Sequence, residues 1–243
     1  MFYNGYGQQI DLSAYNGKKI SILGDSISTF AGYIPSGNAV YYSGSNAGVY
    51  SVDDTWWKKL INALGMELLV NESWSGSRVA GSAEPAACLT RCENLGTDPD
   101  VIIVYMGIND FNNNVGLGTY NGEGTLPTVT TTFREAYAIM LNKILTKYTS
   151  AEVWVCTLPY CERGTNDGFP EENSTVTLAA WNAAIRELAD LFGVKVLEFS
   201  KCGLTYQNMS VYMGDTLHPK ANGHSLIANQ AIRQMDNRVR TRY

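Results

Sequence analysis

The sequence predicts an α/β protein, built as a five-stranded, mostly parallel sheet with helices on both faces in a single three-layer α/β/α sandwich. Short apolar runs alternate along the chain with longer segments whose apolar residues recur at helical spacing. The chain has 243 residues, 45% hydrophobic and 17% charged, which is enough for one sizeable core without disulfide or metal support. No internal repeat or linker is found, so we expect one domain over residues 1–243 with its core at about 18–236.

The five apolar runs have the length of strands, and their continuous hydrophobicity is typical of strands buried in a parallel sheet. Parallel neighbours are joined by right-handed crossovers, which place helices on both faces. The runs are Lys19–Leu23, Glu67–Asn71, Val101–Met106, Glu152–Cys156 and Val194–Phe199.

Four segments have the periodicity of helices with one apolar face. Gly65 and Gly193 follow two of them as stop signals, and Pro219 lies near the first turn of the last. These segments are Trp56–Leu64, Phe133–Tyr148, Leu178–Phe192 and about Lys220–Met235.

Charge and composition exclude several classes of partner. The net charge is −5 and no basic run occurs, so nucleic acid and anionic membrane surfaces are not expected partners. No apolar stretch approaches the ~20 residues that span a bilayer. Residues 1–9 lack the basic-then-apolar pattern of a signal peptide, so we expect a protein that is not exported or one whose signal has been removed.

Neither a metal nor an organic cofactor is expected. The chain has two histidines without a His-Glu-x-x-His pattern, and its five cysteines form no Cys-x-x-Cys pair. We expect the cysteines to be free structural thiols. They are Cys88, Cys92, Cys156, Cys161 and Cys202.

The residues that follow the predicted strands carry the chemistry. In open parallel sheets the site lies at the carboxyl ends of the strands. Gly24–Ser28, Ser73–Arg78 and Gly107–Asp110 follow the first three strands, and Asp215–Pro219 precedes the last helix.

These segments contain the groups that hydrolysis of an ester requires. A serine hydroxyl needs a base, usually a histidine held in the correct tautomer by a carboxylate. Ser26, His218 and Asp215 meet that need. The developing oxyanion needs preorganised donors, which the Gly76 backbone and the Asn109 amide would supply.

The histidine count favours His218 as the base. Asp215 lies three residues before it, close enough to reach the imidazole from the same turn. The residue three before His224 is Ala221, so His224 has no such partner. We expect His224 to be a packed or capping residue of the last helix.

Each segment also has a structural interpretation. Asp25 and Ser26 are good helix N-caps, and Gly76 could serve a tight turn. Asn109 and Asp110 are common turn formers, and the segment Asp215–His218 could be a solvated loop. That all four occur in this order at strand ends favours the functional interpretation.

Taken together, the four segments resemble the SGNH, or GDSL-type, hydrolase family of esterases and lipases. Gly24–Ser26 matches the Gly-Asp-Ser block and Gly76 matches the glycine of the second block. Gly107–Asp110 matches Gly-x-Asn-Asp, and Asp215–His218 matches Asp-x-x-His.

The resemblance implies a flavodoxin-like fold and a serine esterase mechanism without a cofactor. It implies Ser26 as nucleophile, His218 as base, and oxyanion donors from the Ser26 N–H, the Gly76 N–H and the Asn109 side chain. Asp25 would be structural. Ile27 and Ser28 stand where the family usually has leucine, behind the nucleophile, so little effect on the mechanism is expected.

Other classes lack their motifs or leave the polar set unexplained. No Gly-x-Ser-x-Gly elbow of an α/β-hydrolase occurs, and no phosphate-binding glycine loop of a nucleotide or flavin binder. A carbohydrate-binding module would suit the 15 tyrosines and 5 tryptophans, but binding alone gives no reason for the Ser, His, Asp and Asn set.

The segments beside the predicted site indicate a small acyl ester, acetyl above all, on a carbohydrate. Aromatic and polar side chains there would stack on sugar rings and bond hydroxyls, whereas the apolar groove or amphipathic lid of a lipase is not evident. A lipase, lysophospholipase or thioesterase of the same fold is the alternative. The predicted substrate contacts are Tyr41, Trp74, Arg78 and Tyr160, with Tyr33, Tyr42, Tyr50, Glu162 and Arg163 on the same rim.

Overall fold

The computed structural model describes residues 2–3, 9–10, 13–161 and 176–236. Its main sheet has five parallel strands in the order β4–β3–β5–β6–β7, which confirms the predicted α/β class. A separate antiparallel pair, β1 (Phe2–Tyr3) with β2 (Gln9–Ile10), precedes it in the chain. The main strands are β3 (Lys19–Gly24), β4 (Glu67–Ser73), β5 (Val101–Tyr105), β6 (Glu152–Cys156) and β7 (Lys195–Leu197).

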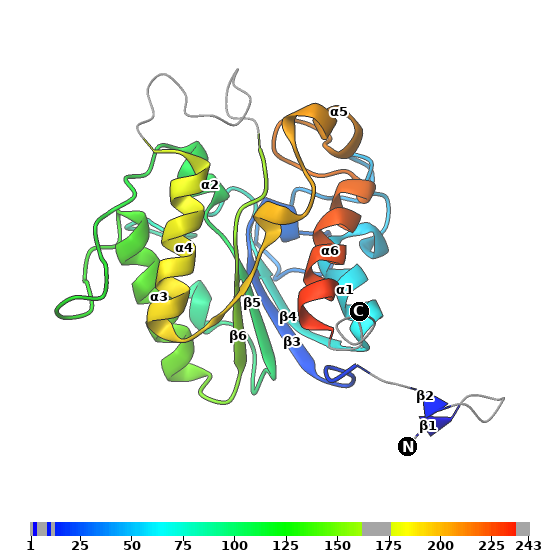
Figure 1. The fold of residues 1–243 in the computed structure, drawn as a ribbon, viewed down its shortest axis with the longest axis horizontal. Helices are drawn as coiled ribbons and strands as arrows, with labels where there is room; N and C mark the ends of the chain where they lie inside the picture. The colour runs from blue at the N-terminus through cyan, green and yellow to red at the C-terminus, as the bar shows by residue number, and fades with distance from the viewer. Residues whose placement is uncertain (1, 4–8, 11–12, 162–175, 237–243) are drawn as a thin grey trace.

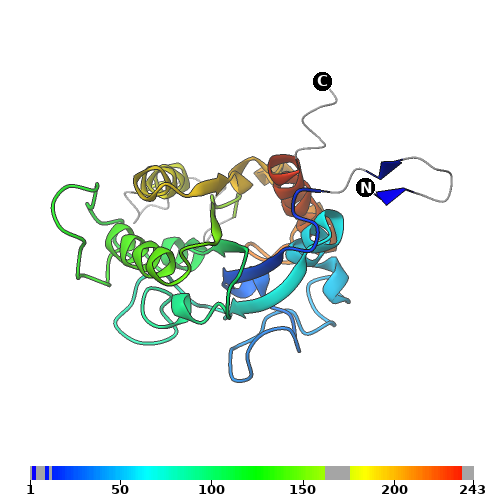
Figure 2. The same cartoon turned by 90° about the horizontal axis from the view of Figure 1, so that it is seen from below.

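Helices cover both faces of the sheet, as Figures 1 and 2 show. The helices α1 (Trp56–Leu64) and α6 (Ala221–Met235) pack together on one face. The helices α3 (Phe133–Lys147) and α4 (Leu178–Phe192) pack together on the other. All four lie within about one residue of the predicted segments.

Glycines end two of these helices in the left-handed conformation, where a side chain would be strained. Gly65 caps α1 with φ 70° and Gly193 caps α4 with φ 66°. At the opposite ends, the hydroxyls of Thr55 and Thr177 accept hydrogen bonds from backbone N–H groups in the first turn.

The core fills the two layers between sheet and helices. All five residues of β5 are buried, as the continuous apolar run predicted. On the α1 side, the Trp56, Tyr105 and Phe199 rings meet edge to face, with centroids 5.0–5.7 Å apart. On the α3 side, the Phe133 and Trp181 ring centroids are 4.3 Å apart.

The structure differs from the prediction in its shortest elements. The strand β7 has three residues rather than the six predicted over Val194–Phe199. It begins one residue later, and at its carboxyl end the chain turns at Glu198, whose carboxylate pairs with Arg186 at 2.7 Å, into η4 (Phe199–Lys201). Two short helices, α2 (Ile108–Asn112) and α5 (Met209–Tyr212), were not predicted, because a helix of four or five residues is too short to show a periodic apolar pattern. The remaining single turns are η1 (Ser26–Ser28), η2 (Val52–Asp54), η3 (Arg91–Glu93) and η5 (Tyr206–Asn208).

All five cysteines are buried, and Cys88, Cys92, Cys156 and Cys202 are free thiols, in agreement with the expectation of structural thiols. Within the described part of the chain, no helix combines the length and the apolar character needed to cross a bilayer.

The register of the sheet places three strand ends level with one another. Gly24 at the end of β3 pairs with Ser73 of β4 on one side and with Tyr105 of β5 on the other. The segments that follow these three strands therefore leave the sheet at one edge, as parallel strands require.

Candidate active site

Ser26 lies in a tight turn directly after β3. Gly24 has no room for a side chain, since a Cβ there would lie 2.6 Å from Ser28 Cβ and from Ser73 Oγ. Asp25 then caps η1 by accepting a hydrogen bond from Ile27 N at 3.0 Å. This turn presents the Ser26 hydroxyl at the carboxyl edge of the sheet, although the residue is only 2% exposed.

His218 reaches Ser26 from the loop between α5 and α6. That loop closes on itself, with a bridge between Met213 and Pro219 and a 2.7 Å hydrogen bond from Gly214 N to His218 O. The His218 Nε2 atom lies 2.9 Å from Ser26 Oγ, and Nδ1 lies 2.8 Å from Asp215 Oδ2. The structure thus brings together the three residues predicted to form the triad, 192 positions apart at the widest.

The Asp215 carboxylate is held by several donors. Its Oδ1 accepts hydrogen bonds from Leu217 N at 2.7 Å and His218 N at 2.6 Å, and its Oδ2 accepts one from the Tyr41 hydroxyl at 2.8 Å. Burial opposes ionisation of Asp215, but the hydrogen bonds from the His218 ring and from the two backbone N–H groups outweigh it and hold its pKa well below its usual range. The carboxylate is therefore ionised beside His218.

Two other carboxyls at this edge are buried and tend toward the neutral form. Burial raises the pKa of Asp25 to about 7, against the opposing hydrogen bond from Ile27 N. Burial also raises the pKa of Asp110 to about 7, although Val79 N and Ala80 N each donate to its carboxylate at 2.8 Å. The Asp110 side chain thereby links the segment after β4 to α2, and the Asp25 side chain caps η1.

Gly76 and Asn109, the predicted oxyanion donors, belong to two segments that contact each other. Gly76 has φ 79° in a turn that Ser77 N closes by donating to Trp74 O at 3.1 Å. The Asn109 side-chain amide donates to Ser77 O at 2.9 Å, so its second N–H remains to face another acceptor. A side chain at Gly76 would have open space but a strained backbone.

Arg91 is a residue of the site that the sequence did not reveal. Its guanidinium is buried and donates to Gly24 O at 3.0 Å, Glu72 O at 2.5 Å and Pro85 O at 3.1 Å, and also to the Ser77 hydroxyl. Glu72 lies 3.5 Å away as its counter-ion. A single arginine within the otherwise largely apolar segment 86–95 is the signal that could have indicated it.

The predicted substrate contacts lie in three places. Trp74 and Arg78 flank Gly76, and Arg78 is exposed at a cavity of about 270 Å³ that Gly76, Ser82 and Glu84 also line. Tyr41 instead packs on His218. Tyr160 lies beyond β6, at a second cavity.

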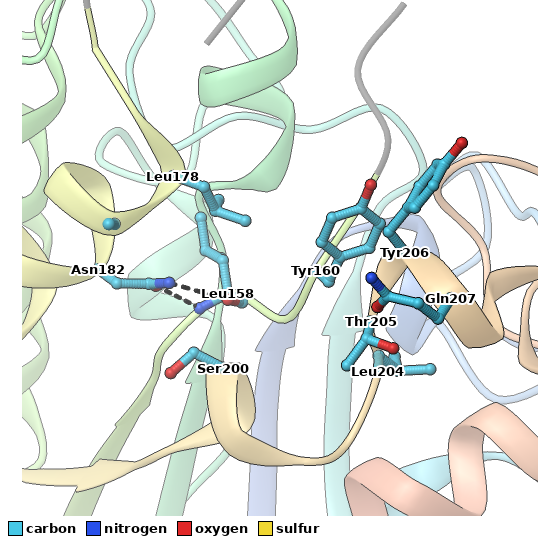
Figure 3. Close-up of a pocket in the computed structure, with 10 residues that line it drawn as sticks. Leu158, Tyr160, Leu178, Asn182, Ser200, Leu204, Thr205, Tyr206 and Gln207 are labelled. Carbon is cyan, nitrogen blue, oxygen red and sulfur yellow. Dashed lines mark hydrogen bonds between the residues drawn. The ribbon is translucent and has the colours of Figure 1, made fainter. Parts of the chain in front are cut away.

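The cavity at Tyr160 has a volume of about 430 Å³ and lies at the carboxyl ends of β6 and β7 (Figure 3). Leu158 and Leu178 form one side, with Asn182 fixed by two hydrogen bonds to the Leu158 backbone. Tyr160 and Tyr206 form the other side. The rest of the lining is Ala179, Ser200, Leu204, Thr205 and Gln207.

Two expectations about the rim need correction. Tyr42 is fully buried rather than exposed, because its hydroxyl donates to Pro219 O at 2.8 Å and its ring packs on His224. An apolar-lined cavity is present that the sequence did not reveal, because its walls come from separate parts of the chain: the segment after β6, α4, η4 and η5. Tyr33 and Tyr50 are exposed, whereas Glu162 and Arg163 lie outside the described residues.

His224 is a packed residue, as expected. It is fully buried on α6, and its Nδ1 accepts a hydrogen bond from Trp56 N at 3.2 Å, which joins α6 to the start of α1. Burial, with the nearby charges of Lys59 and His218, lowers its pKa to about 3.

The fold and the order of these segments agree with comparisons to known proteins. The sequence model of the GDSL-like lipase/acylhydrolase family matches residues 18–235, so the chain belongs to this family of ester hydrolases. No curated protein sequence matches the chain significantly.

Two similar solved structures are described as GDSL-like lipases. The one from Bacteroides ovatus is 27% identical over 90% of this chain and 98% of its own, with a TM-score of 0.71. The one from Bacteroides uniformis is 26% identical over 90% of this chain and 95% of its own, with a TM-score of 0.68. A carbohydrate esterase family 2 enzyme from Myceliophthora fergusii, with a carbohydrate-binding domain, shares the fold at 19% identity over 94% of this chain and 68% of its own (TM-score 0.58).

The raised pKa of Asp25 predicts how stability depends on pH. Between its ordinary value of 3.8 and about 7, folded Asp25 holds a proton that the unfolded chain has lost. The free energy of unfolding should therefore fall as the pH rises through this range, by up to roughly 1.4 kcal/mol per pH unit for one proton. Asp25→Asn keeps an oxygen for the cap but cannot ionise, so urea unfolding from pH 4.5 to 8 should show a flatter curve for this variant.

Asp98→Asn, an exchange at an exposed aspartate, is the matched control and should follow the wild-type curve. Parallel curves for wild type and Asp25→Asn would mean that Asp25 is ionised in the folded protein.

Proposed function

We propose that the protein is a serine ester hydrolase in which Ser26 is the nucleophile, His218 the general base and Asp215 the residue that orients His218. The observation that carries the proposal is the unbroken series of contacts from Asp215 Oδ2 through the imidazole to Ser26 Oγ, at 2.8 and 2.9 Å. Both distances suit proton transfer without rearrangement. Membership of the GDSL-like family supports ester hydrolysis as the reaction.

In the first half of the reaction, Ser26 Oγ bonds to the acyl carbon while its proton passes to His218 Nε2. The carbonyl π electrons move to the oxygen, which becomes an oxyanion. When this tetrahedral species collapses, the bond to the leaving alcohol breaks and the Nε2 proton goes to that alcohol. Water then attacks the acyl-enzyme in the same way and releases the acid and free Ser26.

The oxyanion would be bound by the Ser26 and Gly76 N–H groups and by the free N–H of the Asn109 amide. The hydrogen bonds of Ser77 to Trp74 and Asn109 support this role, because they fix the donors before substrate arrives. Fixed donors need no reorganisation at the moment of reaction.

Removal of the nucleophile or the base tests the proposal directly. Ser26→Ala and His218→Ala should each lower kcat for an activated acetyl ester by ~10³-fold or more, since neither variant can complete the proton transfer. Circular dichroism and urea unfolding should show an intact fold, and Ser210→Ala, at an exposed serine, serves as the control. Near-normal turnover by folded Ser26→Ala would eliminate the serine mechanism.

Asn109 gives a second test, of the oxyanion site. Asn109→Ala should lower kcat by about 10²–10³ with little change in KM, because the lost hydrogen bond is strongest in the transition state. Asn113→Ala is the matched control, since it also removes a hydrogen bond at the end of α2, from Asn113 Nδ2 to Asn109 O. A change confined to KM would make Asn109 a substrate-binding residue.

For the substrate, we propose a small acyl ester, acetyl above all, on a carbohydrate. Exposed Tyr33 and Tyr50 offer faces for stacking on a sugar, and Arg78 and Ser82 beside Gly76 offer partners for hydroxyl groups. Flat aromatic faces with a few polar groups suit a polyhydroxylated alcohol.

The cavity of about 430 Å³ favours a second candidate, an ester with a longer apolar acyl group. Its leucine and tyrosine walls stand at the same edge of the sheet as Ser26, with β5 alone between β3 and β6. Such a cavity would take the chain of a lipase or thioesterase substrate.

Measuring kcat/KM for esters of increasing acyl length, from acetyl to octanoyl, distinguishes the two candidate substrates. We expect kcat/KM to be highest for acetyl and to fall toward octanoyl, and we expect release of acetate from acetylated xylan-type sugars. Ala179→Trp, which would fill the apolar cavity, should leave acetyl hydrolysis unchanged. A preference for octanoyl that Ala179→Trp abolishes, with no acetate from any sugar, would instead establish the second candidate.

A further inference from the structure

Tyr41 makes two contacts with the Asp215–His218 pair that the sequence did not predict. Its hydroxyl donates to Asp215 Oδ2 at 2.8 Å, the same oxygen that lies 2.8 Å from His218 Nδ1. Its ring lies flat on the imidazole, with centroids 3.5 Å apart and planes 10° apart. One side chain therefore touches both the carboxylate and the face of the histidine.

Tyr41 is itself held from both sides of the site. Its backbone N–H donates to Thr29 Oγ1 at 2.9 Å, and that hydroxyl donates to Ser26 O at 2.9 Å. Its carbonyl accepts a hydrogen bond from Asn46 Nδ2 at 2.7 Å. The next residue, Tyr42, is bonded to Pro219 O, directly after His218. The Tyr41 ring is thus fixed relative to both the nucleophile and the base.

These contacts restrict the two motions that would misplace the imidazole. The hydrogen bond to Asp215 fixes the direction of Nδ1 but leaves the ring free to tilt about it, and the stacked phenol removes that tilt. Asp215 is 44% exposed on its side chain, so water competes for its oxygens. Burial, and the hydrogen bond to Asp215, raise the pKa of the Tyr41 phenol, which keeps it a donor.

The stack also acts on charge. When His218 accepts the Ser26 proton it becomes a cation, and an aromatic face in contact with a cation stabilises it. The phenol O–H has the opposite effect. It donates to the Asp215 carboxylate and so weakens the attraction between that carboxylate and the imidazolium. The ring and the hydroxyl can therefore be separated by mutation.

We propose that Tyr41 is a positioning residue of this site: its ring sets the plane of His218 and stabilises the imidazolium, and its hydroxyl holds the Asp215 carboxylate. The proposal rests on the proposed serine mechanism and replaces the predicted contact of Tyr41 with substrate.

Charged and titratable groups surround His218 on every side. Asp215 lies on its own loop, and Tyr41 and Tyr42 come from the segment 31–50. Asp25 precedes Ser26 in the chain, and His224 of α6 lies on the far side of Tyr42, whose ring contacts both histidines. Burial raises the pKa of Asp25, so the test compares proteins that differ at Tyr41 alone and retain Asp25.

The test uses Tyr41→Phe, which keeps the ring, and Tyr41→Leu, which removes ring and hydroxyl. We expect Tyr41→Leu to lower kcat for an acetyl ester by about 10–100-fold with KM nearly unchanged, because a misplaced base affects the transition state. Tyr41→Phe should stay within about tenfold of wild type. The same two exchanges at Tyr120, another half-buried tyrosine, whose backbone N–H donates to Glu135 of α3, are the controls and should have no effect.

A proton NMR titration gives a readout that needs no turnover. The chain has two histidines, and burial, with nearby positive charges, lowers the pKa of His224 to about 3, so the titration of His218 can be followed separately. Its midpoint should lie higher in Tyr41→Phe than in wild type, and lower in Tyr41→Leu than in Tyr41→Phe by about half a pH unit.

Three results would overturn the proposal: equal midpoints in all three proteins, an unchanged kcat in Tyr41→Leu, or a rise in KM at constant kcat. If Tyr41→Leu does not fold, the upward shift in Tyr41→Phe still decides. Absence of ester hydrolysis by the wild type would reject the proposed function, and the titration would then test the contacts of Tyr41 alone.

Discussion

The arrangement of the site depends on one buried cation. The Arg91 guanidinium bonds carbonyls at the ends of β3 and β4 and the hydroxyl of Ser77 in the next segment, so it joins the turn that carries Ser26 to the segment that carries Gly76. A buried charge is costly unless it is paired and hydrogen-bonded, and Glu72 with these carbonyls meets both conditions. Loss of Arg91 would leave Glu72 without its counter-ion and the two strand ends without a common partner.

Three carboxyls near the site illustrate how the fold sets charge by local hydrogen bonding. Asp215 is half-exposed and surrounded by donors, so it is held ionised. Asp25 and Asp110 are buried with fewer donors, and burial prevails over hydrogen bonding in both. The carboxylate that contacts His218 is thus the one that the surrounding groups keep negative, while burial raises the pKa of the two that accept hydrogen bonds from the backbone.

Local patterns predicted the parts of this molecule that depend on neighbours in sequence. Strand positions followed from apolar runs, and the ends of α1 and α4 followed from Gly65 and Gly193. Ser26 is predictable because its motif follows the first strand, and Asp215 and His218 because theirs precedes the last helix. The contacts of Arg91 and Tyr41 could not be predicted, because each joins segments far apart in the chain: Tyr41 and Asp215 are 174 positions apart. The end of β7 could not be predicted from hydrophobicity, because the apolar Phe199 lies in η4 rather than in the strand.

The wide separation of Ser26 and His218 along the chain has a consequence for biosynthesis. A ribosome makes the N-terminal part of a chain first, and folding begins before synthesis ends. All five main strands are complete by Leu197, whereas His218 arrives with the segment that leads into α6. A nascent chain can therefore assemble its sheet before His218 is made. Under the proposed mechanism, the Ser26 hydroxyl would acquire its base only when α6 docks on α1, so the emergence of the last helix would also time the onset of reactivity.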